Sequence, residues 1–169
     1  MIRKILVTYA TRHGSTAEVA EVIAQELRQS ETTQVDVCPI EQVSNLAPYE
    51  AVVIGSAVHI NNWLPEAVSF VKEHKAELEK VPTAYFTTCF TMQADTNTNR
   101  ATAASYLKAV RDMLKPMDEA YFAGKLSFKQ LSLFERFMLR LRGAKEGDYR
   151  NWTAIRGWAN TLRARLQQS

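Results

Sequence analysis

The sequence has few of the residues that form cross-links or bind metals. Its two cysteines, Cys38 and Cys89, lie far apart and form no CxxC pair. Two cysteines are too few for a disulfide scaffold. The three histidines, His13, His59 and His74, lack the spacing of metal ligands. We therefore expect neither a disulfide framework nor a metal site.

Long hydrophobic runs are also missing from the sequence. No stretch reaches the roughly 20 apolar residues that a membrane-spanning helix needs. The opening residues, Met1 to Val7, have too short an apolar part for a signal peptide and lead directly into a strand pattern. The sequence therefore predicts a cytoplasmic protein, whose only membrane contact would be peripheral, on the inner face of the cell membrane.

The composition is typical of a single globular domain over residues 1–169, with 46% hydrophobic and 23% charged residues. Residues 1–124 carry 11 basic and 15 acidic side chains, a net charge of −4, whereas residues 125–169 carry 10 and 3, a net charge of +7. This asymmetry favours an anionic partner, and a solvated basic face is the simpler alternative. Because no helix-turn-helix or RNA-binding signature accompanies the charge, nucleic acid is not the expected partner.

Short apolar runs alternate with amphipathic helical patterns along most of the chain. This alternation indicates βαβ units and a parallel sheet. We therefore predict an α/β fold, a doubly wound five-stranded parallel sheet of order 2-1-3-4-5 with right-handed crossovers. The expected strands are 5–9, 33–37, 51–55, 83–88 and 119–124, and the expected helices are 16–28, 65–74, 100–114 and 151–166.

One amphipathic segment, within about residues 125–148, has no place in this plan. Large apolar side chains alternate there with basic ones, which is typical of a helix that lies on a membrane surface. The alternative is a helix that folds back and hides its apolar face in the core. The predicted membrane or substrate contacts are Phe128, Lys129, Phe134, Arg136, Phe137 and Arg140.

The loop after the first strand has the residues of an anion site. Its hydroxyls and a glycine precede a helix, whose free N–H groups and dipole favour a phosphate. No lysine follows Gly14 as in a P-loop, and a GxGxxG pattern is absent, so a terminal phosphomonoester fits better than ATP or a dinucleotide. A simple Ser/Thr helix cap is the alternative. The predicted cofactor residues here are Thr11, Arg12, His13, Gly14, Ser15 and Thr16.

Two further loops leave the carboxyl ends of the third and fourth expected strands. In a doubly wound sheet, these ends border the ligand site. Trp63 offers an aromatic face for stacking on a flat ligand, or else packs in the core. The predicted contacts are Ser56, Ala57, His59, Asn61 and Trp63 in one loop, and Thr88, Cys89, Phe90 and Thr91 in the other.

The first loop, Thr11 to Thr16, resembles the flavodoxin phosphate loop Ser/Thr-x-Thr-Gly-Asn-Thr, with His13 and Ser15 as departures. The whole chain is similar to the menaquinone-dependent protoporphyrinogen IX dehydrogenases of bacteria. The matching stretches are 53–57, 70–74, 123–126 and 134–141, followed by Trp152 in the last helix, and Gly124 in the third of them is a further predicted cofactor residue.

This resemblance implies an FMN enzyme that takes electrons from a porphyrinogen and passes them to a membrane quinone. The cofactor supplies such chemistry, so no catalytic side chain is assigned. The positive charge of the C-terminal part argues against an alternative, a soluble electron carrier with an acidic face. His13 favours another alternative, a module that has lost its flavin.

Overall fold

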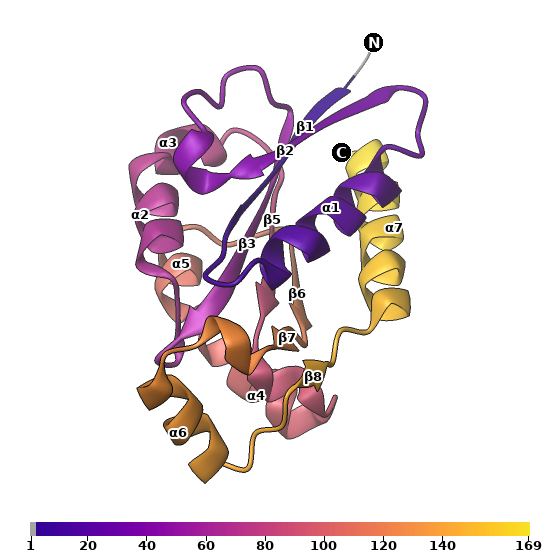
Figure 1. The fold of residues 1–169 in the computed structure, drawn as a ribbon. Coiled ribbons are helices and arrows are strands. Elements are labelled where there is room, and N and C mark those ends of the chain that lie inside the picture. The colour runs from indigo at the N-terminus through magenta and orange to yellow at the C-terminus, as the bar shows by residue number, and fades with distance from the viewer. Residues whose placement is uncertain (1–2) are drawn as a thin grey trace.

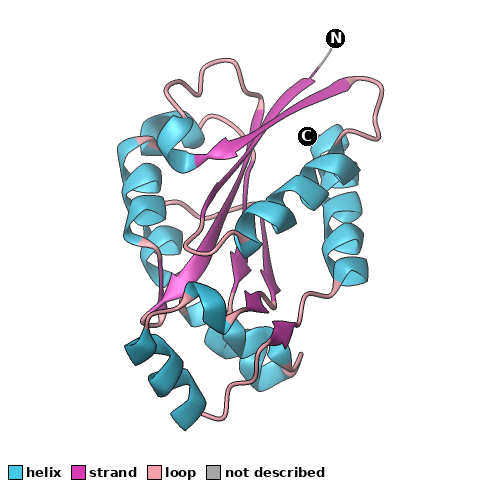
Figure 2. Cartoon of the chain, viewed as in Figure 1, coloured by secondary structure: helices cyan, strands magenta, loops and turns pink. Residues whose placement is uncertain are grey.

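The apolar runs form the strands of a central sheet in the computed structural model, which describes residues 3–169 (Figures 1 and 2). The main sheet has the order β2-β1-β3-β5-β6, all parallel, with the short β4 antiparallel to β3. The short β4 was not among the five predicted strands, so β5 and β6 are the fourth and fifth of them. The predicted order 2-1-3-4-5 is therefore confirmed. The strands are β1 (Arg3–Ala10), β2 (Thr33–Pro39), β3 (Ala51–His59), β4 (Asn62–Trp63), β5 (Thr83–Thr88) and β6 (Asp118–Phe122).

Helices cover both faces of this sheet, so its central strands are buried on both sides. Successive strand residues point to opposite faces, and accordingly Tyr85 packs in one core cluster and Phe86 in the other. Helices α1 and α7 cover the Phe86 face, and α2 to α5 contribute to the Tyr85 face. The helices are α1 (Ser15–Leu27), α2 (Pro65–Glu73), α3 (Lys75–Leu78), α4 (Asn97–Ser105), α5 (Lys108–Met113) and α7 (Trp152–Gln168), with 3-10 turns η1 (Ile40–Gln42) and η2 (Phe90–Gln93).

Glycine at position 55 permits the closest approach in the core. A Cβ atom built there would lie 1.9 Å from Cζ of the buried Phe86 ring, well inside van der Waals contact. The Phe86 ring therefore occupies the space over the middle of β3 that any larger residue at this position would need.

The predicted helix over 100–114 is two helices in the structure. The chain turns at Tyr106 and Leu107, between α4 and α5. The carbonyl oxygen of Tyr106 accepts a hydrogen bond of 3.3 Å from the backbone N–H of Trp63 in β4. In a continuous helix this carbonyl would accept a hydrogen bond from the same helix, but here it accepts one from a distant part of the chain.

Residues 125–148 form a separate lobe, called the insert below, under the carboxyl ends of the strands (Figure 1). Its two ends pair as antiparallel strands, and the N–H of Tyr149 donates to the carbonyl of Gly124 at 3.3 Å. Ser132 and Glu135 form a capping box that starts its helix. The insert contains β7 (Lys125–Leu126), η3 (Phe128–Gln130), α6 (Leu133–Leu141) and β8 (Gly147–Asp148).

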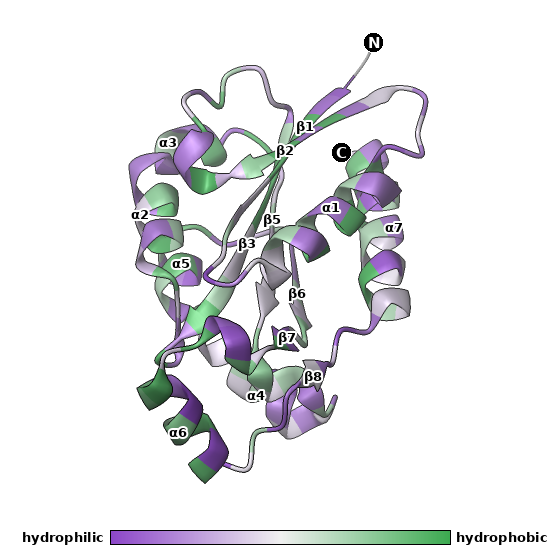
Figure 3. Ribbon diagram, viewed as in Figure 1, coloured by the Kyte–Doolittle hydropathy of each residue, from purple (hydrophilic) through white to green (hydrophobic). Residues whose placement is uncertain are grey.

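The apolar face of α6 is exposed, which contradicts the alternative that this helix folds back into the core. Green and purple segments alternate along it in Figure 3. Its large apolar side chains range in exposure from 37% at Met138 to 82% at Leu133. The exposed set is Leu133, Phe134, Phe137, Met138 and Leu141.

Arg150 links α1 to the neck of the insert, the place where β7 pairs with β8. Its Nε and Nη2 atoms donate to the Asp148 carboxylate at 2.8 and 2.6 Å, and Nη1 pairs with Glu18 in the first turn of α1. Its guanidinium lies 4.5 Å from the ring centre of Trp152. Hydrogen bonding to Asp148 raises the pKa of this side chain, which is only 5% exposed. One side chain thus joins β8, α1 and α7.

Within residues 3–169, no helix combines the length and apolar character required to cross a bilayer. Nor do these residues bring together three or more His, Cys, Asp or Glu side chains in a group that could hold a metal ion. The predicted domain over residues 1–169 and the prediction about a signal peptide both include Met1 and Ile2, which lie outside the described residues.

Candidate functional site

The carboxyl ends of β1, β3 and β5 and the insert border one pocket of about 510 Å³. This volume is in the range of small-molecule sites, which is about 300–1,000 Å³. The pocket lies where the strand order reverses, the expected position in a doubly wound sheet. The predicted cofactor residues that line it are Thr11, Arg12, His13, Ser15, Thr16, Ala57, His59, Asn61, Thr88, Cys89, Phe90, Thr91 and Gly124.

The first loop leaves the amino end of α1 open to a ligand. The residue that caps α1 is Gly14, in the left-handed region with φ of 89°, so a Ser or Thr side chain does not cap the helix. Thr11 Oγ1 accepts a hydrogen bond of 3.0 Å from the Gly14 N–H, which leaves its own hydroxyl hydrogen to donate elsewhere. The N–H groups of the first turn of α1 are therefore available to an anion.

Thr16 differs from the other hydroxyls of this loop because it is fully buried. Its Oγ1 lies 2.6 Å from Oγ1 of the buried Thr88, a hydrogen bond between the start of α1 and the end of β5. This bond fixes the position of the first loop against the third. We therefore assign Thr16 the role of holding the loop in place, with Thr11 and Ser15 as the more available hydroxyls.

Of the two roles expected for Trp63, stacking on a flat ligand and packing in the core, the structure supports the second, because this side chain is buried in the core. Trp63 is 2% exposed, and its Nε1 donates to Thr87 Oγ1 at 2.8 Å. The ring makes an edge contact with Tyr85, with centroids 5.1 Å apart. An exposed aromatic ring at the pocket comes from Phe90 instead, which is 44% exposed.

Ser56 also lies beside the pocket and not in its lining. Its hydroxyl donates to the carbonyl of Ala57 at 2.7 Å and accepts from the N–H of Leu64 at 3.1 Å. These bonds hold the end of β3 against the start of α2. Like Trp63, Ser56 therefore stabilises the loop after β3 without lining the pocket.

The turn between β3 and β4 contributes a residue that the sequence analysis missed. Ile60 and Asn61 have φ of 50° and 58°, and Ile60 is 78% exposed at the pocket wall. A β-branched residue in the left-handed region is a true conformational outlier. The turn therefore presents an apolar side chain to the mouth of the pocket at a conformational cost.

Cys89 lies at the pocket but is not a reactive thiol. Burial raises its pKa to about 11, so the side chain is a neutral thiol at neutral pH. The neighbouring Thr91 hydroxyl lies 2.9 Å from the Tyr106 hydroxyl, which anchors the third loop to the end of α4. The third loop is thus fixed in place, with Phe90 partly exposed in the lining of the pocket.

The insert adds charged groups to the pocket that the sequence analysis did not select. Lys125 and Arg142 line it together with Arg12 of the first loop. Glu135 also lines it, with His13 and His59 close enough to contribute to a lowered pKa of its carboxyl, whose main cause is the hydrogen bond from the Ser132 backbone N–H. Fixed positive charge therefore exceeds negative charge around the pocket.

The predicted contact residues of the insert fall into different environments. Phe134 lines the pocket and is 72% exposed, whereas Phe137 faces outward at 58% exposure. The Arg136 guanidinium donates to the carbonyl of Leu131, and that of Arg140 lies 5.2 Å from the ring centre of Phe128. Lys129 lies in η3, where its carbonyl accepts from Arg136 at 3.4 Å.

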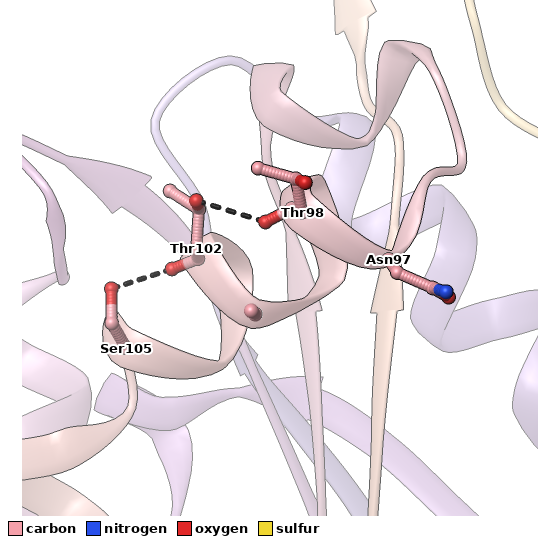
Figure 4. Close-up of a pocket in the computed structure, with 5 residues that line it drawn as sticks. Asn97, Thr98, Thr102 and Ser105 are labelled. Atoms are coloured by element: carbon pink, nitrogen blue, oxygen red, sulfur yellow. Dashed lines mark hydrogen bonds between the residues drawn. The ribbon is translucent and has the colours of Figure 1, made fainter.

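A second, shallow pocket lies on the outer face of α4 (Figure 4). The Thr102 hydroxyl donates to the carbonyl of Thr98 at 3.0 Å, and the Ser105 hydroxyl donates to the carbonyl of Thr102 at 2.6 Å. Since these hydroxyls bond to their own helix, this pocket has less to offer a ligand than the one at the strand ends.

The doubly wound sheet, with the open amino end of α1 at its switch point, is the arrangement of flavodoxin-type α/β domains. Residues 6–151 match the family described as Flavodoxin domain, and the chain belongs to this family. The predicted fold class and family resemblance are thereby confirmed.

Two relatives carry the same name, Protoporphyrinogen IX dehydrogenase [quinone], which denotes an oxidoreductase. The protein of Leishmania major is 28% identical over 95% of this chain and 75% of its own length. The protein of Escherichia coli K12 is 24% identical over 94% of both chains.

Solved structures support the fold. A flavodoxin from the domain Archaea aligns with a TM-score of 0.54 and 15% identity over 97% of this chain and 99% of its own. A Lactobacillus acidophilus flavoprotein in complex with FMN aligns with a TM-score of 0.51 and 16% identity over 72% and 93%. The rubredoxin oxygen:oxidoreductase of Desulfovibrio gigas aligns with a TM-score of 0.61 and 16% identity over 98% of this chain, which spans only 36% of that longer protein.

Proposed function

We propose that this chain is an FMN-dependent oxidoreductase that passes electrons from a reduced tetrapyrrole to a membrane quinone. The observation that carries the proposal is the open amino end of α1, which faces a pocket bordered by both the flavodoxin loops and the insert. The names of the two relatives supply the substrate and acceptor classes.

The residues around the pocket fit FMN. A Cβ built at Gly14 would meet no atom within 4 Å in the described structure, so no neighbouring group crowds the loop at this residue. Thr11, Ser15 and the first-turn N–H groups of α1 would hold the phosphate. Phe90 would offer an aromatic face to the ring system. When bound, FMN supplies two-electron chemistry between a reduced substrate and an acceptor.

The insert would cover the substrate in this proposal. Leu131, Phe134 and Leu139 form an apolar wall of the pocket opposite the flavodoxin loops. A flat apolar substrate would bury its surface against this wall, and water would be excluded from the reacting groups. The chain thus orients the substrate, and its own side chains need not change oxidation state.

The outward face of α6 would contact a membrane. Leu133, Phe137 and Leu141 are exposed on it, and the insert carries more basic than acidic residues. Large apolar side chains enter the interface, while Lys and Arg meet anionic headgroups. Peripheral binding would bring the pocket close to a lipid-soluble quinone.

The cofactor assignment is tested by titrating the purified, flavin-free protein with FMN and with riboflavin. We expect FMN to bind more tightly, because only FMN carries the phosphate. Thr11→Val should weaken FMN binding about tenfold and leave riboflavin binding unchanged, since it removes one hydrogen bond to a charged group. Thr98→Val, on the exposed face of α4, is the matched control. Equal affinity for both ligands would contradict the phosphate site.

The activity is tested by quinone-coupled oxidation of protoporphyrinogen IX with the flavin-loaded protein. We expect turnover that depends on both substrate and quinone. A flavin-loaded protein that reduces a soluble partner but does not oxidise the porphyrinogen would contradict the proposal and favour an electron carrier. A protein that takes up neither flavin would favour a binding module without redox function.

A further inference from the structure

The basic side chains of the insert form two sets that differ in position. Lys125 and Arg142 line the pocket, whereas Lys129, Arg136, Arg140 and Lys145 are outside its lining. Lys125 lies in β7 at the neck, and Arg142 follows the last turn of α6, so the two approach the pocket from opposite ends of the insert. We call Lys125 and Arg142 the inner pair.

Neither member of the inner pair forms a salt bridge with the described residues. Within residues 3–169, no carboxylate oxygen lies within 4.0 Å of a side-chain nitrogen of either residue. Asp148, the register partner of Lys125, gives its carboxylate to Arg150. Glu135 accepts from the Ser132 N–H at 2.9 Å within the capping box. The inner pair therefore presents positive charge to the pocket.

Two of the outer basic residues, Arg136 and Arg140, already make contacts within the insert. Arg136 donates to the carbonyls of Leu131 and Lys129 and so closes the turn before α6. Arg140 lies over the ring of Phe128. These contacts support the shape of the insert, and among its basic residues only the inner pair lines the pocket, beside Arg12 of the first loop.

The pocket between the inner pair and the sheet combines this charge with an apolar wall. Leu131, Phe134 and Leu139 face it from the insert, and Phe90 faces it from the third loop. A ligand that satisfies both features is flat and apolar in its body and carries carboxylates at its edge. We propose that Lys125 and Arg142 bind the carboxylate side chains of the substrate and determine its specificity. This inference rests on the proposed function.

Binding of a redox-inert porphyrin tests the inference without any turnover. The probes are protoporphyrin IX, which has two carboxylates, and its dimethyl ester, added to FMN-loaded protein and followed by fluorescence. We expect the diacid to bind at least tenfold more tightly than the ester, because hydrogen bonds to charged groups are the stronger kind. The variant Lys125→Gln/Arg142→Gln should bind both probes equally.

The matched control is Lys129→Gln/Arg140→Gln, which removes the same charge from the outer set and should keep the preference for the diacid. Circular dichroism and FMN affinity establish that each variant is folded, and Arg142→Lys should retain part of the preference. Equal binding of both probes to the wild-type protein would overturn the inference. So would an equal loss of preference in both double variants.

The other anion that the inner pair could bind is the phosphate of FMN. If the inner-pair variant lost affinity for FMN but not for riboflavin, and kept its preference for the diacid, the pair would serve the cofactor and the inference would be overturned. Failure of the proposed function has a different signature, the absence of quinone-coupled porphyrinogen oxidation. The probe titrations can be read whichever way that assay turns out.

Discussion

The sheet with its covering helices and the insert are built in opposite ways. In the first region, apolar side chains are buried from both faces, as Phe86 and Ile155 at 0% exposure show. In the insert, α6 keeps Leu133 and Phe134 more than 70% exposed. The first region is stabilised by its own packing, whereas α6 is started by a capping box and held through the neck of the insert.

This contrast indicates that the residues of the sheet region serve stability, whereas those on the exposed face of α6 serve contact with another molecule. Burial of apolar surface stabilises the sheet and positions the three loops that border the pocket. The exposed apolar face of α6 contributes little to folding, and contiguous exposed apolar surface usually marks a contact with a ligand, a partner or a membrane. Stability and recognition are thus largely separated along this chain.

Truncating one phenylalanine in each region should give the largest difference. Phe122, 7% exposed with its ring centre 5.9 Å from that of Trp158, packs in the core. Phe122→Ala should lower the free energy of unfolding by about 3–5 kcal/mol, and Phe137→Ala on α6 should change it by less than about 0.5 kcal/mol. Urea denaturation followed by circular dichroism measures both. Similar losses would show that α6 packs as part of the core.

Arg150 tests the connection between the two regions. Arg150→Gln removes the contacts with Asp148, Glu18 and Trp152, and should lower the free energy of unfolding by about 1–2 kcal/mol. Amide hydrogen exchange should increase most in residues 125–148, because the neck of the insert loses its link to α1. Lys108→Gln, which removes an exposed pair with Asp112, is the control. Unchanged exchange in the insert would contradict this role.

The smallest expected difference between the two regions is in how much unfolding free energy each loses at acidic pH. Burial would raise the pKa of Glu119, but hydrogen bonds from Arg111 and Tyr121 outweigh it and hold the pKa below the ordinary 4.5. The stabilisation from this group is therefore present above that pH and lost as the pH falls through the lower, folded pKa.

Glu119→Gln should accordingly flatten the decline in unfolding free energy in this acidic range. Glu135→Gln should leave that decline unchanged, although the pKa of Glu135 is also lowered, because the capping box of α6 can open without unfolding the sheet. Denaturant titrations at a series of pH values compare the two variants. Parallel pH profiles for wild type and Glu119→Gln would contradict the assignment.

Much of the fold could be predicted from sequence because long apolar runs carry a clear signal. The runs at 5–9, 51–55 and 83–88 fall within β1, β3 and β5. The two-residue strands β4, β7 and β8 were not predicted, since periodicity has no meaning over two residues. The break between α4 and α5 was missed because it depends on a contact with Trp63, distant in sequence.

The site was predicted less completely, for a similar reason. The first loop has a local pattern, and the structure places Thr11, Arg12, His13, Ser15 and Thr16 at the pocket. Whether an aromatic side chain is exposed depends on what packs over it, so Trp63 and Phe90 could not be told apart from sequence. Lys125 and Arg142 reach the pocket only because the neck of the insert brings 125 and 148 together.

The chain leaves the sheet region at Gly124 and returns at Tyr149, and these two residues are hydrogen-bonded to each other. A segment with such closely spaced ends can be lengthened, shortened or exchanged with little disturbance to the rest of the molecule. Grafting a different lobe between these two positions would therefore change what the pocket accepts while the loops on the sheet side of the pocket keep their geometry.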